Sequence, residues 1–145
     1  MTVDYNAFEE SLEAVTTDII PTSGTNLAEA ISAAQSTLKN DANHKLLILI
    51  TDGEDLGGNA LQAAQNAARD DMKIFTVGVG TSEGELIPTM VNGQREYIKN
   101  DENTFVISRL DAQMLRSIAT ATDGLYAPLG NQGQGLETIY QKKLA

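Results

Sequence analysis

A carboxylate stands at the end of the most apolar segment of this chain. Asp52 directly follows the run KLLILIT at residues 45–51, and a hydroxyl from Thr25 precedes a predicted helix. Carboxylate and hydroxyl oxygens suit hard cations, above all Mg²⁺, which keeps several of its waters when bound. Simpler roles also fit: a helix cap for Thr25 and an Asx turn closing the strand for Asp52. Glu54 and Asp55 are most simply solvated loop charges.

A strand–helix–strand unit is predicted to position Asp52. Residues 45–51 are too short for a lone helix and are bounded by turn residues, so they predict a strand covered on both faces of a parallel sheet. Residues 73–79 predict a second such strand. The Ala-rich segment 59–71 between them predicts a helix, and its start at Asn59 fits a capping box. Because ligands bind at the carboxyl ends of strands in open parallel sheets, Asp52 is expected at a binding edge.

Further helices and a hairpin are predicted around this unit. Residues 6–17 and 26–39 carry apolar residues at helical spacing, with a capping box starting at Asn6. The turn signal Asn92-Gly93 predicts a small antiparallel hairpin within residues 86–107, appended to the main sheet. The remaining predicted elements are a helix at 112–122 capped by Asp111, an αL cap at Gly124, a third parallel strand at 125–127 and a last helix carrying Leu136, Ile139 and Tyr140.

The length and composition indicate one domain. A chain of 145 residues with 41% hydrophobic residues can bury a core without staples. The predicted fold class is α/β, a Rossmann-like open parallel sheet with helices on both faces and an added hairpin, as a single domain over residues 1–145. The sequence has no Cys, which excludes disulfides and zinc–thiolate sites. His44 is the single histidine, so nucleophilic sites built on a His base are disfavoured.

The charge balance limits the class of partner. The chain carries 20 Asp plus Glu against 10 Lys plus Arg, a net charge of −10. This surplus repels phosphate backbones, so we exclude nucleic acid as a partner. The longest apolar run, from Leu46 to Ile50, is far shorter than the ~18 residues that span a bilayer. We therefore expect no membrane segment in this chain and a soluble form.

Three segments together resemble the von Willebrand factor type A (VWA) domain. They are SGTNL at residues 23–27 followed by a helix, LILITDGED at 47–55 and IFTVGVG at 74–80. Within that family the chain looks closest to the bacterial aerotolerance (Bat-type) proteins. Their domain carries a segment like VISRLD at residues 106–111, followed by a helix and a Gly-Tyr pair like that of GLY at 124–126. The resemblance runs over nearly the whole chain.

The resemblance implies a metal-ion-dependent adhesion site built from three loops. Thr25 and Asp52 match the second and third of these loops. The first loop, an Asp-x-Ser-x-Ser pattern, does not occur in this sequence. The chain begins after the positions of the family's first three strands and first helix, so we expect an N-terminally truncated domain with an incomplete metal site. Two oxygen ligands cannot replace several waters of Mg²⁺, and weak or no metal binding is therefore expected.

The expected truncation also affects packing. In the family, the strand matching residues 45–51 pairs with the missing first strand, so backbone groups on that side would lack partners. An unprotected apolar edge recruits another strand. We therefore expect a homodimer in which the segments from Leu46 to Ile50 of two copies pair. The alternative is that Phe8 and the Ile19-Ile20 segment fold over the edge.

These observations favour a non-enzymatic protein–protein interaction module with an unidentified protein partner. One alternative is a structural or assembly domain without a metal function. Another is a phosphotransfer enzyme using Asp52, but Lys45 and Lys73 begin their strands at the opposite end from it. A dinucleotide site in residues 78–84 is disfavoured because the third glycine comes one residue late. Bat-type relatives are typically tethered by flanking transmembrane segments, so the resemblance implies the extramembrane part of a bacterial protein, in a compartment that the sequence leaves open.

Overall fold

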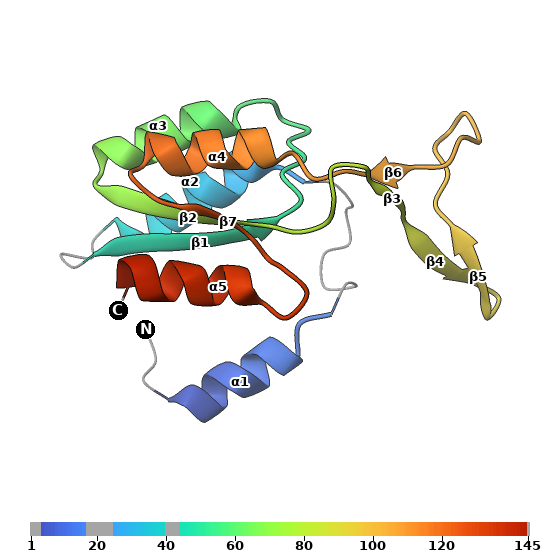
Figure 1. Ribbon diagram of the computed structural model, residues 1–145, viewed down its shortest axis with the longest axis horizontal. Helices are drawn as coiled ribbons and strands as arrows, with labels where there is room; N and C mark the ends of the chain where they lie inside the picture. Colours follow the sequence, from blue (N-terminus) through green and yellow to red (C-terminus); the bar gives the residue numbers. More distant parts are fainter. Residues whose placement is uncertain (1–3, 17–24, 40–43, 145) are drawn as a thin grey trace.

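The structure, a computed structural model, describes residues 4–16, 25–39 and 44–144. Its centre is a parallel sheet with the strand order β1–β2–β7, and two small antiparallel pairs, β3–β6 and β4–β5, lie outside it (Figure 1). The α/β fold class predicted from the sequence is confirmed. The strands are β1 (Lys45–Thr51), β2 (Met72–Gly78), β3 (Glu85–Leu86), β4 (Pro88–Val91), β5 (Gln94–Tyr97), β6 (Ile107–Ser108) and β7 (Tyr126–Pro128). The helices are α1 (Tyr5–Glu13), α2 (Leu27–Leu38), α3 (Ala60–Arg69), α4 (Ala112–Ala121) and α5 (Gln134–Ile139), which continues as a π-helical turn, Tyr140–Leu144.

Strand β2 is the buried centre of the sheet. On one face, Met72 and Ile74 belong to a core shared with α2, α3 and α4. On the other face, Phe75 and Val77 pack with Ile139 of α5. Figure 1 shows the same division, with α2, α3 and α4 on one side of the sheet and α5 on the other. Helices on both faces are therefore confirmed, and the strict alternation of side chains in β2 fills both layers.

Strand β1 is only half covered, which contradicts the prediction that both its faces are buried. Its burial alternates along the strand, and the exposed residues are Leu46 at 39%, Ile48 at 41% and Ile50 at 54%. These side chains lie on the face of the sheet that carries α5. The physical reason is that α5 packs against β7 and β2 and does not extend over β1, which is the outer strand of the order β1–β2–β7. An apolar strip consequently faces outward.

Two helix starts differ from the predicted capping boxes. Helix α1 is capped by Asp4, whose Oδ1 accepts from the backbone N–H groups of Asn6 and Ala7, each at 3.1 Å. Helix α3 gains no side-chain cap from Asn59, and Asp55 Oδ2 instead accepts from the Ala60 N–H at 2.9 Å. Predicting Asp55 as a solvated charge was therefore wrong. A carboxylate at a helix N-terminus also interacts favourably with the helix dipole.

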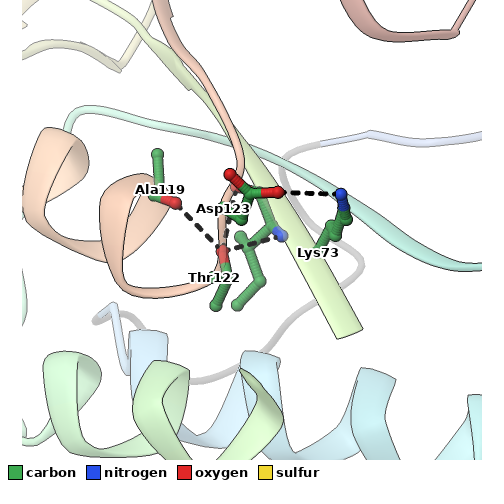
Figure 2. A network of polar contacts seen from close by, with 5 residues as sticks. Lys73, Ala119, Thr122 and Asp123 are labelled. Carbon is green, nitrogen blue, oxygen red and sulfur yellow. Dashed lines mark hydrogen bonds and ion pairs between the residues drawn. The ribbon is translucent and has the colours of Figure 1, made fainter. Parts of the chain in front are cut away.

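A buried hydroxyl joins the end of α4 to β2. The Ile74 N–H donates to Thr122 Oγ1 at 3.0 Å, and the hydroxyl lies 3.2 Å from the carbonyl oxygen of Ala119, to which it donates (Figure 2). Strand β7 begins to pair with β2 only at Thr76. At Ile74, where β7 does not yet pair with β2, Thr122 therefore supplies the acceptor, and the buried Ile74 N–H is not left unpaired.

The same helix end shows why the prediction of an αL cap at Gly124 was wrong. The left-handed residue is Asp123, with φ of 55°, and Gly124 is not left-handed. The N–H groups of Asp123 and Gly124 donate to the carbonyls of Thr120 and Ala119, which completes a Schellman motif one residue earlier than predicted. Gly124 is needed for a different reason, since a Cβ there would collide with the carbonyl oxygen of Ile74.

An exposed ion pair closes this corner. Lys73 Nζ lies 2.9 Å from Asp123 Oδ2, as Figure 2 shows. The hydrogen bond and the charge of Lys73 hold the pKa of the Asp123 carboxyl below its ordinary value. Because the side chains are exposed, the pair contributes little to folding stability in water.

Residues 84–109 form an arm that extends from the carboxyl end of the sheet (Figure 1). Strands β4 and β5 make the predicted hairpin, and both residues of its Asn92-Gly93 turn have positive φ, at 50° and 78°. This is the conformation that a type I′ turn requires. The hairpin pairs with neither β1, β2 nor β7, so its predicted attachment to the main sheet is wrong.

The predicted covering of the β1 edge is not seen in the described residues. Phe8 lies on α1, remains 59% exposed, and belongs to a helix in which no residue is buried. The Ile19-Ile20 segment lies outside the described residues. On the side away from β2, β1 pairs with no strand of the described chain.

Candidate functional site

The candidate site is the carboxyl end of β1 and the loops around it. The β1 register aligns Thr51 with Gly78, so the loops that follow these residues leave the sheet side by side. The backbone bond from Val79 N–H to the Thr51 carbonyl, at 2.9 Å, extends this pairing one residue further. Residues 52–59, the start of α2 and the segment leading into α4 therefore meet at one end of the sheet.

The carboxylate of Asp52 is held by two close donors, and the Thr51 hydroxyl lies at the longer distance of 3.5 Å from its Oδ1. Its Oδ2 accepts from the hydroxyl of Ser108 at 2.8 Å, and its Oδ1 accepts from the Glu54 N–H at 3.1 Å. The second contact is the Asx turn that the sequence suggested for this residue. The first joins β1 to the arm across 56 positions of sequence. Asp52 is therefore a connecting residue between the sheet and the arm, whatever else it binds.

The backbone reinforces this connection. The Asp111 N–H donates to the Asp52 carbonyl at 2.8 Å. Gly53 follows with φ of 84°, and a Cβ at this position would lie 2.8 Å from the carbonyl oxygen of Asp111. A side chain at residue 53 would thus be strained in its own backbone and would push the α4 start away. The sharp turn predicted after Asp52 is needed for this close approach.

Thr25 borders the same region but does not cap α2. The cap is Asn26, whose Oδ1 accepts from the Glu29 N–H at 3.1 Å. The half-buried Thr25 contributes its carbonyl, which accepts from the Leu56 N–H at 3.2 Å. The loop that follows Asp52 is therefore tied directly to the loop that carries Thr25. Joint ligation of a metal by the two side chains stays a prediction.

The donor set around Asp52 is small. In residues 4–16, 25–39 and 44–144, no group of three or more His, Cys, Asp or Glu side chains lies together as a metal site would require. Asp55 Oδ2 is used in the α3 cap, while its Oδ1 is buried and has no hydrogen-bond partner among these residues. A Mg²⁺ ion prefers six oxygens in a near-octahedral shell. The described side chains alone do not supply that shell.

Ser108 is the site residue that sequence reasoning did not single out. It lies in the segment 106–111 that carries the family resemblance, but the resemblance assigns it no role. No local signal identifies it, because its partner Asp52 is distant in sequence and only the return of the arm brings them together. The register Glu85↔Ser108 of the β3–β6 pair fixes its position.

A sequence model of the von Willebrand factor type A domain matches residues 2–123. The chain belongs to the VWA domain family. This confirms the resemblance inferred from the TDGED turn and the flanking segments. VWA domains are generally non-enzymatic protein-interaction modules. No curated protein matches this VWA chain closely enough to count as a relative.

Two solved structures are similar to this VWA domain. One is an aerotolerance-related membrane protein from Bacteroides fragilis NCTC 9343, with 28% identity and a TM-score of 0.85 over 97% of this chain and 69% of that one. The other is the conserved hypothetical protein BatB from Bacteroides thetaiotaomicron, with 32% identity and a TM-score of 0.84 over 95% of this chain and 67% of that one. The described part of this VWA chain holds no helix that is long and apolar enough to cross a membrane.

Proposed function

We propose that this chain is a Bat-type VWA domain that binds protein through the open edge of its sheet, not through a complete metal site. The exposure of β1 supports the proposal. This strand is the outermost one of the described sheet, and its side chains Leu46, Ile48 and Ile50 form an exposed apolar strip. An unpaired strand edge offers N–H and C=O groups to any extended segment placed beside it.

The partner on this edge is a second copy of the chain. Two β1 strands that pair edge to edge would form one continuous sheet, in which the Leu46, Ile48 and Ile50 side chains of the two copies partly cover each other. Burial of apolar surface stabilises such a contact by roughly 25 cal/mol per Å² before the costs of association are subtracted.

The metal plays a minor part in this proposal. Asp52 and Thr25 are the residues that would approach a divalent cation, but the Asp52 carboxylate already accepts hydrogen bonds from Ser108 and Glu54 within the domain. Two protein oxygens compete poorly with water for Mg²⁺. We therefore propose weak or no Mg²⁺ binding by this chain, and self-association that does not change when EDTA is added.

The alternatives differ from this proposal in measurable ways. A purely structural role predicts no dependence of association on β1. A phosphotransfer role predicts labelling of Asp52 by a small phosphodonor, although Lys45 and Lys73 lie within the first two residues of β1 and β2, at the opposite end of the sheet. We propose that this chain catalyses no reaction. We further propose that the chain is the extramembrane part of a bacterial membrane-tethered protein. The similar structure from Bacteroides fragilis, which is described as a membrane protein, supports this.

The test is sedimentation velocity of the full chain and two variants. Ile48→Lys places a charge on the exposed strip, whereas Leu61→Lys places the same charge at an exposed position of α3. We expect Ile48→Lys to abolish the dimer that forms through β1 and Leu61→Lys to preserve it. If the native chain is a monomer with slow amide exchange throughout residues 46–50, the edge is covered within one chain and the proposal fails.

A further inference from the structure

The arm presents a second exposed surface, distinct from the β1 edge. Its hairpin register pairs Met90 with Arg95, and Tyr97 lies two residues further along the same face of β5. An isolated bridge between Lys99 and Phe105 continues this face beyond the hairpin. We call the exposed residues Met90, Arg95, Tyr97, Lys99 and Phe105 the arm face.

Ring contacts hold the cations of the arm face. Arg95 lies 5.9 Å from the Tyr97 ring centroid, and Lys99 lies 5.0 Å from that of Phe105. The two rings meet edge to face at 6.3 Å. Among the described residues, Lys73 and Asp123 form an ion pair, but neither Arg95 nor Lys99 pairs with a carboxylate. Cation–π contacts leave the positive charge available to an acidic partner.

Helix α1 has the complementary character. Phe8 and Leu12 lie four residues apart and form an exposed apolar stripe, and the exposed Val15 follows two residues after the helix ends. Glu9 and Glu13, also four apart, lie along one flank of that stripe by helical geometry. Residues 1–38 contain no Lys or Arg, so none of them offsets the acidic charge of Glu9 and Glu13.

We propose that α1 of one copy docks on the arm face of a second copy. The apolar stripe would cover the Tyr97 and Phe105 rings, while Glu9 and Glu13 would meet Arg95 and Lys99. This is recognition of an amphipathic helix by an exposed face of complementary charge. A helix of nine residues on a narrow face is a small interface, so the contact is weak and transient. It is one form of the proposed protein-binding function but does not depend on pairing of β1.

A charge swap in the full chain tests the contact by sedimentation equilibrium up to millimolar concentration. The double variants R95E/K99E and E9K/E13K should each weaken self-association by about tenfold or more. The quadruple variant, which restores opposite charges and the native net charge, should return to the native affinity. The control K142E/K143E changes net charge as R95E/K99E does, on exposed residues of the C-terminal turn, and should leave association unchanged.

Three results would overturn the proposal. They are a native chain that stays monomeric throughout, an arm variant that associates like the native chain, and a quadruple variant that stays as weak as the doubles. If Ile48→Lys abolishes association while R95E/K99E leaves it intact, the contact is the β1 edge and the arm face is not used. Phe8→Ala gives an independent test. It should weaken association but leave the free energy of unfolding of the domain unchanged, because no residue of α1 is buried.

Discussion

Replacing Thr122 by Val tests whether the hydroxyl at the end of α4 completes the sheet. Valine has nearly the same shape as threonine, so the change removes an acceptor without opening a cavity. Thr122 is 4% exposed, and its Oγ1 is the acceptor for the Ile74 N–H at 3.0 Å. In the valine variant that N–H stays buried without a partner.

The expected cost follows from which group loses its partner. A buried donor left unsatisfied costs about 1–3 kcal/mol. The matched control is Thr76→Val, because Thr76 is also buried but its hydroxyl donates to the Leu115 carbonyl at 2.9 Å. That carbonyl lies inside α4 and keeps its helical bond, so the control should cost only about 1 kcal/mol or less.

Urea denaturation followed by circular dichroism gives the free energy of unfolding of both variants. Hydrogen exchange of the Ile74 amide gives a local reading and should quicken selectively in Thr122→Val. Thr122→Ser keeps the acceptor and should preserve the protection of that amide. Two results would refute this reasoning: an equal loss of unfolding free energy in Thr76→Val and Thr122→Val, or equal protection of the Ile74 amide in both. Either would mean that the Thr122 hydroxyl is not the acceptor that keeps the Ile74 N–H paired.

Three further outcomes are expected. Ser108→Ala removes a donor to the Asp52 carboxylate, so stability should fall by about 1–2 kcal/mol and exchange of the β3–β6 amides should rise; unchanged exchange would contradict the connecting role. Gly124→Ala forces a Cβ against the Ile74 carbonyl and should cost about 2 kcal/mol or more in urea titration, whereas Gly58→Ala meets no atom within 4 Å and should cost only its positive φ, about 1 kcal/mol. Lys73→Met should raise the pKa of Asp123 measured by carboxyl NMR. Because Lys73 lowers that pKa in the folded state, the pair stabilises at neutral pH, and its contribution is lost as pH falls through the lowered value; an unmoved titration would refute the pairing.

Local pattern was enough to predict most elements. The strand at residues 45–51 follows from a short apolar run between turn residues, and the Asn92-Gly93 hairpin follows from the positive φ that both turn residues tolerate. Asp111 was predicted as the cap of α4, and its Oδ1 accepts from the Met114 N–H at 2.9 Å. These signals lie within a few residues of the structure they specify, so one sequence is sufficient to read them.

The errors arose where neighbouring residues compete for one local role, or where the partner is distant in the chain. Asn59 fits a capping box, yet Asp55 reaches the Ala60 N–H first because the loop after β1 folds back. Gly124 fits a helix cap, yet a glycine is required there because the Ile74 carbonyl of β2 lies too close for a Cβ. Exposure of one face of β1 could not be read from its apolar run, because a fully apolar strand looks the same whether one or both faces are covered.

The sequence by itself therefore determined the family, the order of most elements and the carboxylate at the end of β1. Tertiary structure alone decided that Ser108 holds this carboxylate, that the arm stands apart from the main sheet, and that an apolar strip remains uncovered. The difference is physical: propensity and turn chemistry act over a few residues, whereas a hydrogen bond across 56 positions exists only after the chain has returned to meet itself.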